Sequence, residues 1–180
     1  MTFDMDVAKA GQLFESVPDP ARIPRVNTYE ISTDPGRLQL DAVHAYLTRS
    51  YWSPGIPKAL VARAIANSMC FGLYLVETGP PSHGQALDQG ETQVGFARVV
   101  TDKSSFAYLA DVYVLEEHRG QGLSKRLVQT IQAHPDLQGL RRFMLATLDA
   151  HGLYAQFGFK PVAAPERVME LRLTPPWLQN

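Results

Sequence analysis

The hydrophobic positions of the chain follow a strand period of two in some stretches and a helix period of about 3.6 residues in others. Residues 109–115 are apolar on both alternating faces apart from Asp111, as expected of a central strand covered on both sides. After a short turn, apolar residues at helical spacing predict an amphipathic helix, and these are Leu123, Leu127, Val128 and Ile131. Pro135 ends this helix, because the residue before a proline is pushed out of helical geometry.

Comparable patterns predict the other elements. Strands are expected at 28–33, 69–76, 92–101, 106–115 and 141–147, helices at 38–50, about 60–65 and 150–157, and two closing strands at 159–162 and 168–173. Hairpin-joined strands followed by alternating strands and helices predict an α/β fold, a mixed sheet with helices on both faces. We expect a loosely ordered, proline-containing extension at 1–26, a single domain at 27–180, and a solvated loop at 78–90.

The turn between the central strand and its helix is the main candidate for binding chemistry. Gly120 and Gly122 precede a helix N-terminus, where free backbone amides and the helix dipole attract anions and glycine allows close approach. The turn therefore predicts a phosphate site, with a plain tight turn as the alternative. A P-loop would need Gly-Lys-Ser/Thr, which is absent, and a dinucleotide-binding turn would need a third glycine where Lys125 stands.

Two motifs in this region match one protein family. The run from Arg119 through Gly120, Gln121, Gly122 and Leu123 to Ser124 resembles the acyl-CoA signature Gln/Arg-x-x-Gly-x-Gly/Ala of the GCN5-related N-acetyltransferase (GNAT) family, with Ser124 in the last place. Residues 147–159 look like the family's Asn-x-x-Ala-x-x-Leu-Tyr-x-x-x-Gly-Phe, with Thr147 in place of Asn. The resemblance covers roughly residues 28–173 and implies the acyl-CoA N-acyltransferase fold, with a mostly antiparallel sheet.

The resemblance also implies a reaction, the transfer of an acetyl group from acetyl-CoA to an amine in a ternary complex. Backbone amides from Arg119 to Ser124 would hold the pyrophosphate, assisted by the Ser124 hydroxyl and by the charges of Arg119 and Lys125. Backbone groups of Val112, Tyr113 and Val114 would pair with the pantetheine arm and polarise the thioester. Thr147 would take over a polar contact that asparagine makes in relatives.

Candidate catalytic residues follow from the second motif and from charge placement. Tyr154 stands where the family's tyrosine protonates the departing thiolate, unless its ring only packs against the sheet. Asp111 is the only charge in its strand and is either a base with a raised pKa or the partner of an arginine. His151 lies three residues before Tyr154 and is a weaker candidate base. Asp149 is expected to cap the last helix.

The acceptor pocket of the family lies beside the segment between the first two helices. Tyr51 and Trp52 are therefore expected to contact the amine substrate, or else to anchor that segment by packing. Tyr113 and the 78–90 loop are further candidates. The acceptor itself, a small-molecule or a protein amine, is not defined by the motifs.

Composition restricts the remaining possibilities. A formal net charge of −1 gives no reason to expect nucleic acid or anionic lipid as a partner. The single Cys70 cannot form an internal disulfide, no metal-ligand spacing is present, and the N-terminus lacks signal-peptide features, so we expect a cytoplasmic protein without a metal. A homodimer is possible, as in relatives. An alternative to the enzyme is a catalytically silent acyl-CoA-binding module, and a nucleotide-phosphate-binding protein is disfavoured.

Overall fold

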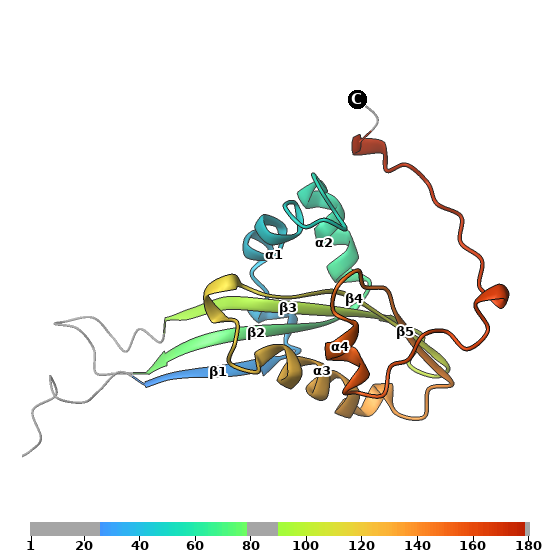
Figure 1. Ribbon diagram of the computed structural model, residues 1–180. Coiled ribbons are helices and arrows are strands. Elements are labelled where there is room, and N and C mark those ends of the chain that lie inside the picture. Colours follow the sequence, from blue (N-terminus) through green and yellow to red (C-terminus); the bar gives the residue numbers. More distant parts are fainter. Residues whose placement is uncertain (1–25, 79–89, 179–180) are drawn as a thin grey trace, which may run out of the picture.

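One five-stranded sheet forms the centre of the protein. The structure is a computed structural model that describes residues 26–78 and 90–178. The strands, in both chain and spatial order, are β1 (Val26–Ser32), β2 (Met69–Thr78), β3 (Glu91–Thr101), β4 (Phe106–Val114) and β5 (Arg142–Leu145). Strands β1 to β4 are antiparallel neighbours and β5 runs parallel to β4, which confirms the predicted mixed, mostly antiparallel sheet (Figure 1). The expected N-terminal extension and most of the expected 78–90 loop lie outside the described residues.

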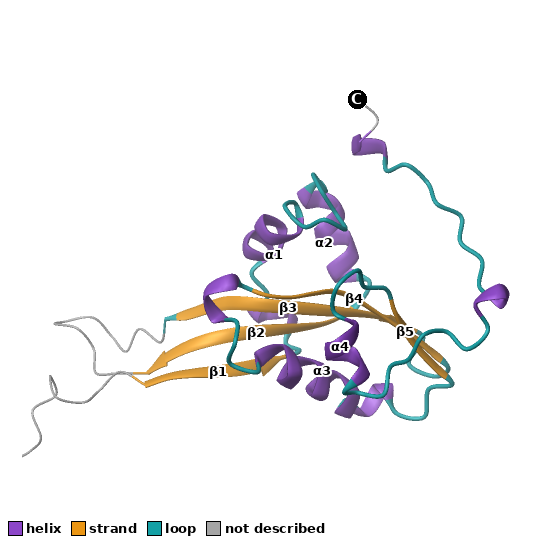
Figure 2. Ribbon diagram, in the orientation of Figure 1, coloured by secondary structure: helices purple, strands orange, loops and turns teal. Residues whose placement is uncertain are grey.

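Helices cover both faces of the sheet, as the sequence predicts (Figure 2). They are α1 (Leu40–Leu47) and α2 (Lys58–Ala66) on one face, and α3 (Leu123–Ala133) and α4 (His151–Ala155) on the other. The strand period of two separates the two cores: on β2, Cys70 packs with α1 and α2, whereas Phe71 packs with α3. The first helix is shorter than expected at both ends: Leu38 is the C-cap of a 3-10 turn at Pro35–Arg37, and the chain leaves the helix after Leu47.

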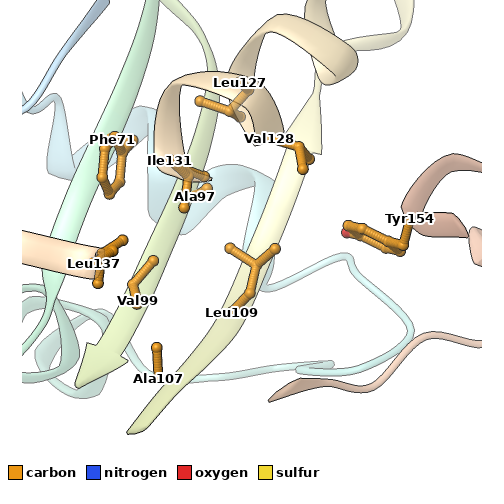
Figure 3. Packing of buried hydrophobic residues seen from close by; sticks show 10 residues of the cluster. All are labelled: Phe71, Ala97, Val99, Ala107, Leu109, Leu127, Val128, Ile131, Leu137 and Tyr154. Carbon is orange, nitrogen blue, oxygen red and sulfur yellow. The ribbon is translucent and has the colours of Figure 1, made fainter. Parts of the chain in front are cut away.

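The core beneath α3 contains the helical stripe read from the sequence. Leu127, Val128 and Ile131 are fully buried against apolar side chains of β2, β3 and β4. Figure 3 shows this packing and the Tyr154 ring, which approaches it from α4. Burial of these side chains fixes α3 on the sheet and, with it, the turn that precedes the helix.

The two expected closing strands are wrong for this chain. Residues 159–162 and 168–173 form no strand, and the chain beyond α4 runs away from the sheet (Figure 1). Phe159 still packs on Phe143 and Tyr154, but Pro161 follows, which has no backbone donor for a strand ladder. Residues 168–173 carry a strand pattern without a neighbouring strand to pair with.

The turn between β3 and β4 is closed by one carboxylate. Asp102 Oδ1 accepts hydrogen bonds from the backbone amides of Ser104, Ser105 and Phe106, and the Ser105 hydroxyl donates to its Oδ2. These bonds, the strongest of them from Phe106, hold the pKa of Asp102 well below its usual range. The turn sets the register of β4, the strand on which the site described below is built.

We expect Asp102→Asn to lower the melting temperature at neutral pH. Because the pKa of Asp102 is depressed in the folded state, its contribution to stability is present above its ordinary pKa of 3.8 and is lost as pH falls below it. Thermal unfolding at several pH values tests this: the difference between wild type and variant should shrink as the pH drops below about 4. An undiminished difference at low pH would contradict the ionic role.

Candidate active site

A cavity opens where β4 and β5 separate. The two strands pair only from Phe106 with Arg142 to Leu109 with Leu145, so the rest of β4 has no partner on that side among the described strands. The space between them forms part of a cavity of about 1020 Å³, lined by β4, by the segment after α1, by the first turn of α3, and by α4 with the segment (146–150) that joins it to β5. Val112, Tyr113 and Val114 all line this cavity, and the ring of Tyr113 stacks on Tyr46 of α1 with 3.7 Å between ring centroids. Their contact with the pantetheine arm stays a prediction.

The glycine turn has the geometry expected of an anion site. Gly120 and Gly122 adopt φ values of 77° and 74°, which side chains of other residues rarely allow. No atom lies within 4 Å of the position that a Cβ would take at either glycine, so both are required by backbone conformation and not by crowding. Within the described part of the chain, the backbone amides from Gly120 to Lys125 donate to no acceptor, and these free donors begin α3.

The side chains in and next to the acyl-CoA motif (119–125) make different contacts. Ser124 lines the cavity, whereas Lys125 points to solvent and the buried Leu123 packs beneath the turn. Gln121 Nε2 donates to the Tyr29 hydroxyl at 3.2 Å. Arg119 holds the end of β4, because its Nε donates to Val114 O at 3.0 Å and its terminal nitrogen contacts Glu116 Oε1 at 2.8 Å. To contact a phosphate, Arg119 would have to release these partners, so the predicted contact between Arg119 and phosphate stays a prediction.

Asp111 lies at a bulge and is paired with an arginine. Its φ is +55°, at the point where the β3–β4 register shifts, and this turns its side chain into the cavity. Arg98 Nε of β3 donates to Asp111 Oδ2 at 2.5 Å, and Trp52 Nε1 donates to Oδ1 at 3.1 Å. The sequence left two interpretations of Asp111 open, a catalytic base or the partner of an arginine, and the structure shows the arginine pair. A role as base remains untested.

The segment between α1 and α2 closes one side of the cavity. Tyr51 and Trp52 both line it and contact each other edge to face at 4.9 Å between ring centroids. The Tyr51 hydroxyl accepts a hydrogen bond from the Leu148 amide at 3.3 Å, while Trp52 reaches Asp111. This segment therefore connects α1 both to β4 and to the chain after β5. Both aromatic residues keep large exposed fractions, so they are available to a ligand as well as anchored.

Tyr154 reaches the cavity from the opposite side. It lies on α4, is only 8% exposed, and lines the cavity. Burial, with smaller contributions from Tyr51 and Asp149, raises the pKa of its hydroxyl to about 12. Within the described residues the hydroxyl has no hydrogen-bond partner. It is thus a protonated, uncommitted donor at neutral pH.

The residues around α4 take different places from those expected. Thr147 Oγ1 accepts from the Ala150 amide at 3.0 Å and so supports the start of α4, a task that we expected of Asp149. Asp149 does not cap the helix, since its side chain bonds none of the first-turn amides. His151 does not line this cavity but faces a second one on the other side of α4. Gly158, at φ 83°, closes the helix as predicted.

Sequence reasoning missed Arg98 and Tyr46. Arg98 neutralises Asp111, and the Tyr46 hydroxyl accepts from Arg119 at 3.1 Å. The sequence contained a signal for Arg98: it is the only charge in residues 92–101, Asp111 is the only charge in the next strand, and a short turn joins the two strands. No comparable signal marks Tyr46, whose position depends on how α1 crosses the sheet.

Comparisons with known proteins agree with this geometry. Residues 80–161 match the sequence model of an acetyltransferase (GNAT) domain. A protein of Gibberella zeae named as an acetyltransferase is 38% identical over 139 residues, which cover 71% of this chain and 76% of that protein. A crystal structure from Xanthomonas campestris pv. campestris, assigned to the GNAT family, is 48% identical with a TM-score of 0.69, covering 81% of this chain and 94% of that one.

A more distant structure adds the ligand of a relative. The Clostridium acetobutylicum protein, described with acetyl-CoA, has a TM-score of 0.52 at 12% identity, over 82% of this chain and 96% of that one, and so shares the fold. The chain belongs to the GNAT family and is an acetyl-CoA-dependent N-acetyltransferase. None of the helices in residues 26–78 and 90–178 is long and apolar enough to cross a bilayer.

Proposed function

We propose that this enzyme transfers the acetyl group of acetyl-CoA directly to a primary amine, with both substrates bound at once and Tyr154 as the acid. The observation that carries the proposal is the cavity at the β4–β5 separation. Arg119 and Ser124, at the two ends of the glycine turn with its free amides, line this cavity, and so does Tyr154 with its unpartnered hydroxyl. The turn supplies donors for the pyrophosphate, and unpaired β4 backbone near Val112 supplies donors and acceptors for the pantetheine arm.

The reaction requires one bond to form and one to break. The amine nitrogen attacks the thioester carbonyl carbon, the new C–N bond forms, and the C–S bond then breaks. Tyr154 gives its proton to the departing thiolate, and the proton lost by the amine passes to the tyrosinate and restores the phenol. The pKa of about 12 keeps the phenol protonated at neutral pH until the thiolate departs, and it makes the resulting tyrosinate a strong enough base to recover a proton.

Asp111, Tyr51 and Trp52 form the acceptor side in this proposal. The Asp111 carboxylate faces the cavity, and an ammonium group is attracted to it before losing its proton. The two aromatic side chains give an apolar surface beside that charge. A substrate screen that measures release of free thiol distinguishes a small-molecule amine from a protein amine as the acceptor.

In direct transfer, no acetylated enzyme forms as an intermediate. Cys70, the single cysteine, lies on β2 and is buried against α1 and α2. This burial raises the pKa of its thiol to about 11, so it is a poor nucleophile. We expect initial-rate plots against the two substrates to intersect, and Cys70→Ala to keep wild-type turnover. Parallel lines, or an acetylated enzyme detected by intact mass, would indicate a covalent intermediate instead.

A further inference from the structure

Most of the charges that line the active-site cavity are paired with one another. The side chains that line it and are charged at neutral pH are Arg49, Arg98, Asp111, Glu116, Arg119 and Asp149. Arg98 and Asp111 form one ion pair, with 2.5 Å between Nε and Oδ2. Arg119 and Glu116 form a second, with 2.8 Å between the terminal nitrogen and Oε1. These two pairs are neutral, so the net charges that a ligand meets come from the other two side chains.

Arg49 follows the end of α1 and has a free guanidinium edge. Its Nε donates to Ala45 O, one turn back in the helix, at 2.8 Å, and this bond holds the side chain along α1. Within the described part of the chain, its terminal nitrogens donate to no acceptor and no carboxylate pairs with its charge. A guanidinium is a planar fork of donors that matches the two oxygens of a carboxylate. Arg49 can therefore bind a carboxylate that enters the cavity.

Asp149 supplies the opposite charge from the side of α4. It lies in the segment 146–150, and its carboxylate has neither an ion pair nor a hydrogen bond among residues 26–78 and 90–178. It is close enough to Tyr154 to contribute to the raised pKa of that phenol. A free carboxylate therefore lies near the proposed acid, on the side of the cavity where the amine reacts.

Aromatic rings line the cavity beside Arg49. The ring centroid of Trp52 lies 6.3 Å from that of Tyr46 and 4.9 Å from that of Tyr51. These three residues, which we call the aromatic wall, all line the cavity. Flat rings of this kind bind apolar or aromatic groups by stacking and by edge contacts. The wall therefore suits an apolar part of a ligand whose anionic end is bound by Arg49.

The two free charges belong to opposite walls of the cavity. Arg49 follows α1, which covers one face of the sheet, and Asp149 precedes α4, which covers the other (Figure 2). They form no ion pair with each other within the described chain. A ligand that meets both must therefore have its own two charges separated by a spacer. An α-amino acid, whose charged groups are attached to one carbon atom, does not meet this requirement.

We propose that the acceptor is a small-molecule amino carboxylate in which an apolar spacer separates the amine from the carboxylate. Arg49 binds the carboxylate, the aromatic wall holds the spacer, and Asp149 attracts the ammonium group toward Tyr154. This proposal rests on the proposed function, because it names the acceptor class of the same site. It adds a residue that recognises the acceptor at a distance from the reacting atoms.

Two amines that differ by one carboxylate test the proposal by binding alone. The compounds para-(aminomethyl)benzoate and benzylamine share their ring and their aminomethyl group. In calorimetric titrations of the full chain saturated with CoA, the carboxylate should bind about tenfold more tightly than benzylamine. Phenylalanine, whose charges are adjacent, should show no such advantage over phenethylamine. An equal advantage for phenylalanine would overturn the requirement for a spacer.

Three variants assign the preference to its residue. Arg49→Gln should remove the advantage of the carboxylate, while Asp149→Asn should weaken both amines alike and keep that advantage. Arg63→Gln is the matched control, because Arg63 is exposed on α2 and does not line the cavity, and it should bind both amines as the wild type does. A wild type without preference, or a preference that survives Arg49→Gln, would overturn the proposal. A loss of acetyl-CoA affinity in Arg49→Gln would place Arg49 on a phosphate of the CoA instead.

Release of free thiol from acetyl-CoA, measured with the same amines, tests the proposed function separately. If para-(aminomethyl)benzoate binds through Arg49 but releases no thiol, the binding site stands and the proposed transfer fails. If both amines release thiol equally well in the wild type and in Arg49→Gln, the transfer stands and the role of Arg49 is wrong. The two proposals therefore fail in different measurements.

Discussion

Replacing Tyr154 with phenylalanine should lower kcat by about 10²–10³-fold and leave the affinity for acetyl-CoA unchanged. The substitution removes the proton donor but keeps the ring that packs on Phe159, so the fold of α4 should persist. Without the phenol the thiolate must leave unprotonated or take a proton from water. Steady-state kinetics together with calorimetric titration of acetyl-CoA separate these two effects.

A second tyrosine serves as the control. Tyr108 lines the same cavity from β4 but belongs to neither motif, and Tyr108→Phe should keep kcat within a few-fold of wild type. Because the pKa of Tyr154 is raised to about 12, the wild-type rate should rise with pH as the amine loses its proton, with no decline from this residue below about pH 10. Equal turnover of the Tyr154→Phe protein would remove Tyr154 from the role of acid.

Local pattern was sufficient to predict the five strands of the sheet, the four helices and the glycine turn. The reason is that each depends on short-range periodicity or on a backbone requirement, such as the positive φ of Gly120 and Gly122. The two motifs likewise identified Ser124 and Tyr154, which the structure brings to one cavity although they belong to different helices. Sequence order alone is informative here because both residues follow strands that are neighbours in the sheet.

Partner choice could not be predicted in the same way. Arg119 was expected to face phosphate, yet its guanidinium bonds Val114, Tyr46 and Glu116, because a cation satisfies whichever acceptors the fold brings nearest. Asp149 lost the capping task to Thr147, two residues earlier, through the detailed path of the chain after β5. Residues 168–173 have the alternating pattern of a strand, but a strand also needs a neighbour to pair with, and the described strands provide none for this segment.

Asp111→Asn is expected to lower the free energy of unfolding by about 3 kcal/mol, since it leaves Arg98 without its counter-ion in a mostly buried position. Asparagine tolerates the left-handed conformation at φ +55° and can still accept from Trp52, so the loss reports on the charge pair rather than on strain. For a chain of this length, the melting temperature should fall by roughly 6–12 °C. Denaturant and thermal unfolding of the single variant test this value.

The double variant separates the structural role of Asp111 from a role in catalysis. Arg98→Met combined with Asp111→Asn should unfold with a loss smaller than the sum of the single losses by at least about 1 kcal/mol, because removing both charges leaves no unpaired ion. Additive losses would show that the two residues do not stabilise each other.

Kinetics of the single variants test the role of Asp111 in substrate binding. Asp111→Asn should raise KM for the amine, whereas Arg98→Met keeps the carboxylate and should not. If both variants raise KM equally, Asp111 acts only by holding Trp52 and β4 in place, and the acceptor's charge is recognised elsewhere in the cavity.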